Sequence, residues 1–136
     1  MSLSRPQFIV IALLIFATGI AQPQTRMTST ATRSWPGFWK QFATAINTKN
    51  TNVLRQLMPE DFFDGGGGLT SSEWLQFIND NEKNGSWRDL KRSVARGTKI
   101  LPQKKKSDVP TRITRDNGYY FEFRKNRWWF AGVSED

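Results

Sequence analysis

Residues 119–133 read Tyr-Tyr-Phe-Glu-Phe-Arg-Lys-Asn-Arg-Trp-Trp-Phe-Ala-Gly-Val, and this stretch decides the fold of the 136-residue chain. Over residues 119–124, aromatic side chains at the odd-numbered positions alternate with Tyr, Glu and Arg. This period of two is typical of a half-buried strand. The pair Lys125-Asn126 then leads into a second aromatic run over residues 127–133. We therefore predict an antiparallel hairpin.

The segments before the hairpin are expected to extend the sheet. Residues 111–114 are predicted to pair with it through an Asp-Asn-Gly turn at residues 116–118. A helix that Ser86 caps is expected to end at Gly97. Residues 94–101 fit either the end of this helix or a strand, so the sequence leaves their structure open.

Helical periodicity occupies the first part of the chain. Apolar side chains recur at three-and-four spacing over residues 35–46, after Ser34 as a cap and with Pro36 in the first turn. A second short apolar stripe over residues 53–58 ends at Pro59. The sequence thus predicts two helices in tandem.

A third helix has the most complete start signal. Thr70 and Glu73 have the spacing of a capping box, while Leu69 and Trp74 have the spacing of a hydrophobic staple. We predict a helix from Ser71 to about Asn81, because Asn84-Gly85 ends the segment. Its inward-facing residues are expected to be Trp74, Phe77 and Ile78.

Helices followed by an antiparallel sheet form the α+β pattern. Five segments follow one another in an order found in a known family: Phe38-Trp39-Lys40-Gln41-Phe42-Ala43-Thr44-Ala45-Ile46, residues 54–58, Phe62-Phe63, Ser72-Glu73-Trp74-Leu75, and residues 119–133 with Trp128-Trp129. In this arrangement the chain resembles small exported members of the nuclear-transport-factor-2-like superfamily, whose SnoaL-like or cystatin-like fold is cone-shaped.

The resemblance implies N-terminal helices packed on a curved antiparallel sheet, with an apolar cavity at the open end of the cone. The residues expected to line it and bind a ligand are Phe42, Ile46, Phe62, Phe63, Trp74, Phe77, Phe121 and Trp129. Members of the superfamily include enzymes and non-catalytic modules, so the fold alone does not choose a function. Related folds often dimerise through the sheet, which makes a homodimer one expectation.

The residue inventory disfavours catalysis. The chain contains no His, which many enzymes with this fold pair with a carboxylate. A His-free isomerase or hydrolase would need a carboxyl group of raised pKa and a Tyr donor, and the candidates are Asp61 or Asp64 with Tyr119 or Tyr120. Turn formation and strand packing explain these residues more simply, so we predict no catalytic residue.

No metal site and no cofactor are predicted. Cys and His are absent, and Glu60, Asp61 and Asp64 lack the spacing of a calcium loop. The four glycines at residues 65–68 are not followed by the Lys and Ser or Thr of a phosphate-binding loop. We interpret this run as a flexible connection.

Positive charge is concentrated in the second half of the chain. Residues 83–127 contain 14 Lys and Arg and four Asp and Glu, whereas residues 22–82 contain five and six. Such a segment attracts polyanions by counterion release, so an anionic polymer or membrane surface is the alternative partner. The residues expected to bind it are Arg88, Lys91, Arg92, Arg96, Lys99, Lys104, Lys105 and Lys106.

The first residues predict export. Arg5 precedes an apolar run over residues 8–16, and Gly19 and Ala21 supply the small side chains that a signal peptidase requires. The run is shorter than the roughly 20 residues of a membrane-spanning helix, which disfavours the alternative of an uncleaved anchor. We expect residues 1–21 to be a signal peptide.

The remaining chain is expected to be periplasmic or secreted. Residues 22–33 are predicted to form a disordered leader, and residues 34–136 are predicted to form a single domain. Without Cys, the chain can form no disulfide and carry no lipid at a cleavage-site Cys. The function expected from the sequence is that of a non-catalytic module that holds an apolar small molecule or a partner chain.

Overall fold

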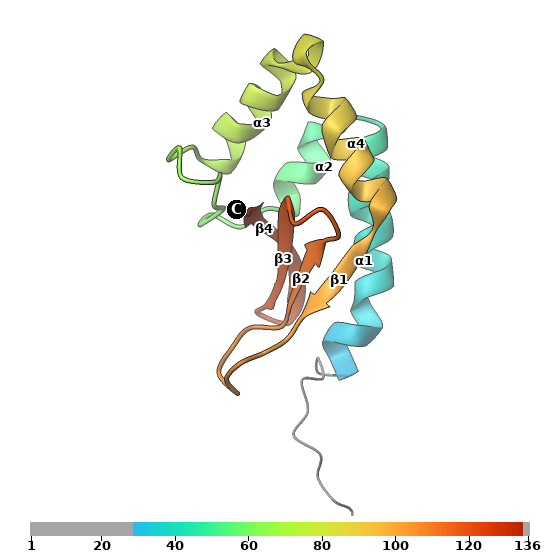
Figure 1. Cartoon of the computed structure of the whole chain (residues 1–136), viewed down its shortest axis with the longest axis vertical. Coiled ribbons are helices and arrows are strands. Elements are labelled where there is room, and N and C mark those ends of the chain that lie inside the picture. The colour runs from blue at the N-terminus through green and yellow to red at the C-terminus, as the bar shows by residue number, and fades with distance from the viewer. Residues whose placement is uncertain (1–28, 135–136) are drawn as a thin grey trace, which may run out of the picture.

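The computed structural model describes residues 29–134, and it confirms an α+β fold (Figure 1). Within these residues the helices are α1 (Ser29–Asn47), α2 (Thr51–Gln56), α3 (Ser71–Asp80) and α4 (Ser86–Arg96), with a 3-10 turn at Glu82–Asn84. The strands are β1 (Thr98–Leu101), β2 (Thr111–Thr114), β3 (Tyr119–Arg124) and β4 (Arg127–Val133). They form one antiparallel sheet in the order β1-β2-β3-β4. The expected signal peptide, residues 1–21, lies outside the described residues.

Helix α1 begins earlier than the sequence predicts. Residues 29–33, which were assigned to a disordered leader, are helical, and Ala31 among them is fully buried. The carbonyl of Ala31 accepts a hydrogen bond from the indole Nε1–H of Trp128 at 2.8 Å. This contact comes from the last strand, so no pattern local to the leader could reveal it.

Ser34 and Pro36 consequently do not mark a helix start. The Ser34 hydroxyl donates to the carbonyl of Thr30 at 2.8 Å, within the helix. Pro36 lies inside α1, where it has no N–H to donate to the carbonyl of Thr32. The predicted capping role of Ser34 was therefore wrong.

The start of α3 is confirmed, and the start of α4 differs from the prediction. The backbone N–H of Glu73 donates to the Thr70 hydroxyl at 3.3 Å, and the Glu73 carboxylate accepts from the Thr70 N–H at 2.7 Å. At α4, the cap position is held by Gly85, whose φ is 91°. Ser86 does not cap the helix but donates its hydroxyl to the carbonyl of Ile78 at 2.5 Å. That bond ties α4 to α3.

The open question of residues 94–101 is resolved by Gly97. Helix α4 ends at Arg96, Gly97 takes a φ of 75°, and β1 starts at Thr98. A left-handed φ is unfavourable for most residues, so glycine allows the sharp change from helix to strand. The hairpin turn at Lys125-Asn126 also has positive φ at both residues, 51° and 63°, which matches the twist of the flanking strands.

The connection after α2 covers the outer edge of β4. The backbone N–H of Phe63 donates to the carbonyl of Ala131 at 3.0 Å, and that of Val133 donates to the carbonyl of Phe63 at 2.8 Å. Gly132 lies between these contacts. A Cβ there would lie 2.6 Å from the Phe63 carbonyl oxygen and 2.8 Å from the Tyr120 ring, so the pairing of Phe63 with β4 requires glycine at residue 132.

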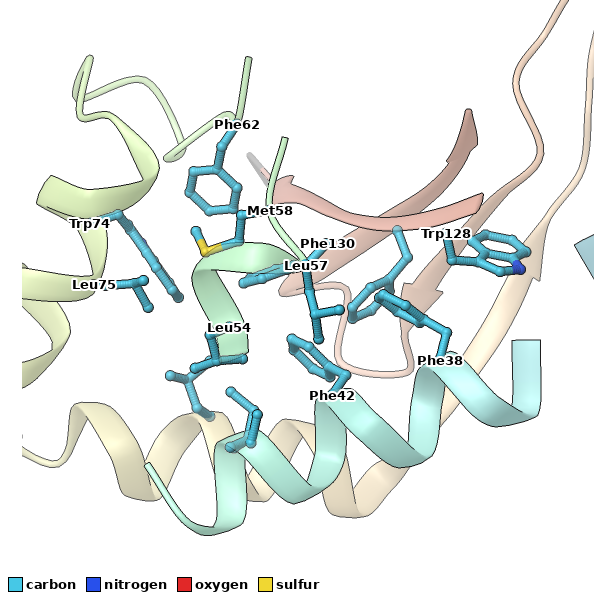
Figure 2. Packing of buried hydrophobic residues seen from close by; sticks show 14 of the residues in the cluster. Phe38, Phe42, Leu54, Leu57, Met58, Phe62, Trp74, Leu75, Trp128 and Phe130 are labelled. Atoms are coloured by element: carbon cyan, nitrogen blue, oxygen red, sulfur yellow. The ribbon is translucent and has the colours of Figure 1, made fainter. Parts of the chain in front are cut away.

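The core lies between α1 and the sheet, with α2 and α3 closing one end (Figure 2). Phe121 of β3 and Phe130 of β4 are neighbours in register, and both are fully shielded from solvent. The Phe42 ring of α1 packs edge-on against both, with centroid distances of 5.0 Å to each. Aromatic rings therefore fill most of the space between the layers.

Candidate functional site

Five of the eight residues predicted to line a cavity lie together in the core. They are Phe42, Ile46, Phe62, Trp74 and Phe121, and all five are buried. Four of them are aromatic and pack in pairs, since the Phe42 and Phe121 centroids lie 5.0 Å apart and those of Phe62 and Trp74 lie 5.3 Å apart. Figure 2 shows Phe42, Phe62 and Trp74 pointing into the same cluster of side chains. These rings occupy the region where a ligand was expected.

Phe77 and Phe63 lie outside this cluster. Phe77 is 51% exposed, whereas Trp74, Leu75 and Ile78 of the same helix are buried. Successive helical residues are rotated by about 100°, so the buried arc of α3 spans Trp74, Ile78 and Leu75 and leaves Phe77 beyond its edge. The prediction that Phe77 faces inward was therefore wrong. The Phe63 side chain is also exposed, while its backbone pairs with β4.

Trp129 lies on the opposite face of the sheet from Phe121. It pairs with Glu122, and neighbouring residues of a strand point to opposite faces. The guanidinium carbon of Arg127 lies 3.9 Å from the centroid of its ring. Trp128 is instead the buried member of the pair, so the placement of Trp129 beside Phe121 was wrong.

The two aspartates considered for acid or base catalysis both have lowered pKa values. The Asp64 carboxylate accepts the backbone N–H groups of Leu69 at 2.9 Å and Gly68 at 3.0 Å, and these bonds hold its pKa below the usual range. Asp61 accepts two hydrogen bonds from the Arg124 guanidinium, at 2.8 and 2.9 Å, which lower its pKa. Asp64 thus organises the glycine loop, and Asp61 pairs with a cation.

The two tyrosines lie on opposite faces of β3. Tyr119 packs against Trp74 with a centroid distance of 6.5 Å, and burial raises its pKa to about 12. Burial also raises the pKa of Tyr120 on the outer face. Neither aspartate has the raised pKa that a His-free isomerase or hydrolase would need, so these residues give that hypothesis no support.

Glu122 is a partly buried carboxylate that the sequence analysis did not select. Burial raises its pKa, and its Oε2 lies 3.0 Å from Arg124 Nε, outside hydrogen-bond geometry. Arg124 thus lies between Glu122 and Asp61. The alternation of β3 predicts that Glu122 lies on the outer face of the sheet. Only the tertiary structure shows that its carboxylate is partly buried there, beside Arg124. A shallow depression of about 380 Å³ adjoins this cluster, and it is lined by Pro59, Glu60, Asp61, Arg124, Lys125 and Trp129.

Four of the predicted cationic residues form a stripe along α4, which we name the α4 basic face: Arg88, Lys91, Arg92 and Arg96. Trp87, Leu90 and Ser93 point the other way and are buried, so the helix is held with its cations outward. Asp89 is the carboxylate on this face, 3.5 Å from Arg88 and 4.0 Å from Arg92.

Arg115 extends this face, although the sequence analysis did not include it. Its backbone N–H donates to the carbonyl of Gly97 at 3.0 Å, which brings it to the end of α4. The side chain is exposed. Lys99, which was predicted to belong to the basic group, is also exposed, on β1 opposite Ile113.

The remaining predicted cations lie elsewhere, in residues 100–110, which comprise the end of β1 and the connection to β2 and which we name the lysine loop. Lys104, Lys105 and Lys106 are exposed there. The backbone N–H groups of Lys104 and Lys105 donate to the Asp108 carboxylate at 2.9 and 2.8 Å. The turn lies at the far end of β1 from α4 (Figure 1). The structure thus divides the predicted basic group between two surfaces.

Within residues 29–134, no cluster of three or more Asp or Glu side chains is placed to hold a metal ion. No helix of that part of the chain is both long enough and apolar enough to cross a bilayer. No protein-family model, curated protein sequence or solved structure matches the chain. The resemblance to the nuclear-transport-factor-2-like superfamily therefore stays a prediction.

Proposed function

We propose that this protein is a non-catalytic binding module that acts through its surface, and that the α4 basic face binds an anionic polymer. The observation that carries the proposal is the outward alignment of Arg88, Lys91, Arg92 and Arg96 on a helix whose other side is buried. The helix holds these cations in a constant arrangement, so less ordering is needed on binding than for a flexible tail.

The spacing of the cations favours an extended ligand. Residues three or four positions apart lie on the same side of a helix, so Arg88, Lys91, Arg92 and Arg96 follow one another along the axis. At about 1.5 Å per residue the stripe is about 12 Å long, and Arg115 continues it beyond Gly97. A chain of repeated negative charges can contact several of these side chains at once, with release of its counterions.

The packed interior favours the surface over a cavity. A ligand between Phe42, Phe62, Trp74 and Phe121 would have to displace rings that contact one another. Binding of an apolar small molecule or a partner chain inside a cone stays a prediction, as does a homodimer formed through the sheet.

The test is a titration of the purified protein with inorganic polyphosphate at increasing salt concentration. We expect the logarithm of the binding constant to fall linearly with the logarithm of the salt concentration. A triple variant, Arg88→Gln with Lys91→Gln and Arg92→Gln, removes three contacts and is expected to reduce the slope by about 3.

The matched control removes three exposed cations elsewhere, through Lys40→Gln, Arg55→Gln and Lys125→Gln. It has the same net charge as the α4 variant. If both triple variants lose affinity equally, net charge rather than the α4 basic face explains binding, and the proposal fails.

A further inference from the structure

We propose that the lysine loop is a second binding surface, which contacts the headgroups and upper acyl region of an anionic lipid bilayer. It is separate from the α4 basic face, and its expected partner is a membrane surface rather than a soluble polymer. The two proposals rest on different residues and can fail independently.

Most of the large apolar side chains that are exposed in the described part of the chain belong to the lysine loop. Five large apolar side chains of residues 29–134 are exposed, and three of them belong to the lysine loop: Ile100 at 46% and Leu101 at 36% at the end of β1, and Val109 at 37% before β2. Of the other two, Phe63 lies in the connection between α2 and α3, and Phe77 lies within α3. Apolar side chains left in water close to a lysine cluster are typical of a surface that enters the boundary between headgroups and acyl chains.

The lysines can contact lipid phosphates while exposed apolar side chains of the same segment enter the bilayer. Ile100 and Leu101 are consecutive residues of β1 and point to opposite faces of the sheet, so only one of the two can do so. Lys104, Lys105 and Lys106 form the exposed tip of the loop. Long lysine side chains can keep their ammonium groups at the interface while the backbone approaches more deeply. Each lysine near an anionic bilayer contributes about 1 kcal/mol to binding.

The loop has a defined shape, because Asp108 organises it from within. Its carboxylate accepts the backbone N–H groups of Lys104 and Lys105, and its own N–H donates to the carbonyl of Lys105 at 3.0 Å. The Gln103 side chain donates to the Asp108 carbonyl. The negative charge of Asp108 is therefore directed toward the loop backbone, and polar backbone groups that would be costly to bury are paired.

The loop and the beginning of α1 lie at the same end of the molecule (Figure 1). At the base of the loop, the Arg112 guanidinium lies 4.6 Å from the centroid of Trp35, in the second turn of α1. Ala31, one turn earlier, accepts the hydrogen bond from Trp128. The lysine loop therefore lies at the end of the molecule where α1 begins.

The absence of Cys from the chain allows a direct test with a single introduced thiol. Ser107→Cys places a polarity-sensitive fluorophore on the lysine loop, and Ser72→Cys places it on the exposed side of α3 as a matched control. The protein without the predicted signal peptide is mixed with vesicles of phosphatidylcholine alone, or of phosphatidylcholine mixed with phosphatidylglycerol. We expect a blue shift at position 107 in the anionic vesicles only, and none at position 72.

Two triple variants then locate the contact. Replacing Lys104, Lys105 and Lys106 by Gln is expected to lower the equilibrium constant for loop contact about 100-fold, because three lysines are lost. Replacing Arg88, Lys91 and Arg92 by Gln is expected to leave it unchanged. For polyphosphate binding the expectation is the reverse, so failure of this inference is distinguishable from failure of the proposed function.

The inference is overturned if position 107 shows no blue shift in anionic vesicles. It is also overturned if the shift survives loss of the three lysines, or if it disappears only in the α4 variant. An equal shift at positions 72 and 107 would overturn it as well, because it would show membrane contact without a specific role of the lysine loop.

Discussion

The two halves of the sheet differ in how they use their side chains. Strands β3 and β4 have six and seven residues, and their inner side chains are large rings packed against α1. Strands β1 and β2 have four residues each, and most of β1 is exposed. Burial of rings stabilises the first half. In the second half, Ile113 and Thr114 of β2 are buried, whereas β1 leaves Lys99, Ile100 and Leu101 in water. The comparison separates the part of the molecule that maintains the fold from the part available for binding.

The largest expected effect comes from the centre of the first half. Phe130→Ala should lower the free energy of unfolding by about 3 to 5 kcal/mol, because Phe130 is fully buried among rings that cannot close the gap. Phe77→Ala removes the same ring from an exposed position and should cost less than about 1 kcal/mol. Urea denaturation measures the free energy of unfolding of both variants. Similar losses of stability would contradict the distinction between the buried Phe130 and the exposed Phe77.

A smaller effect is expected at the edge of β4. Gly132→Ala should destabilise the protein by about 1 to 3 kcal/mol, because its methyl group would overlap the Phe63 carbonyl oxygen. Gly37→Ala is the matched control, since nothing lies within 4 Å of a Cβ at that position in α1. There alanine should stabilise the helix by about 0.5 to 1 kcal/mol. Thermal denaturation should therefore give a lower melting temperature for Gly132→Ala and a higher one for Gly37→Ala. Opposite shifts would confirm that the close approach of the Phe63 carbonyl oxygen explains the loss at Gly132.

A third prediction concerns the tie between α4 and the turn after β2. Asp116 accepts hydrogen bonds from the Ser93 hydroxyl and the backbone N–H of Gly118. Burial alone would raise its pKa, but these bonds prevail and lower it below 3.8. Asp116→Asn should cost about 1 kcal/mol at neutral pH, because a hydrogen bond to a charged group is replaced by a neutral one.

The sign of the pH dependence follows from the lowered pKa. The carboxylate of Asp116 stabilises the fold above its unfolded pKa, and this contribution is lost as the pH falls through the lower folded pKa. The stability difference between the protein and Asp116→Asn should therefore shrink below pH 3.8. A difference that grew on acidification would show that folding raises the pKa of the Asp116 carboxyl group instead of lowering it.

The smallest effect on stability is expected in the lysine loop. Val109→Ser should change the free energy of unfolding by less than about 0.5 kcal/mol, because Val109 is already largely in water. The same change should weaken contact with anionic vesicles several-fold, because less apolar area enters the bilayer. A variant that unfolds more readily but binds vesicles normally would place Val109 with the fold rather than with the binding surface.

Local signals in the sequence predicted most of the elements. The Thr70–Glu73 capping box, the hairpin around Lys125-Asn126 and the turn at residues 116–118 depend on residues a few positions apart. Such features follow from hydrogen bonds and backbone conformations that neighbouring residues determine among themselves.

Candidate binding residues were less predictable, because their environment depends on distant segments. Phe77 has the right residue type for a core position, but the buried arc of α3 is centred on other side chains. Arg115 joins the α4 basic face only because its backbone meets Gly97. The predicted basic residues are close in the sequence, yet β1 separates the lysine loop from α4.

The sequence by itself determined the α+β order, the concentration of cations after residue 82 and the alternation that sends Trp128 and Trp129 to opposite faces. Those properties follow from composition and from the periods of helix and strand. Only the tertiary structure decided which of the two tryptophans is buried, that residues 29–33 belong to α1, and that aromatic rings fill the interior. Burial is a property of what packs against a residue, and in this fold the packing partners come from opposite ends of the chain.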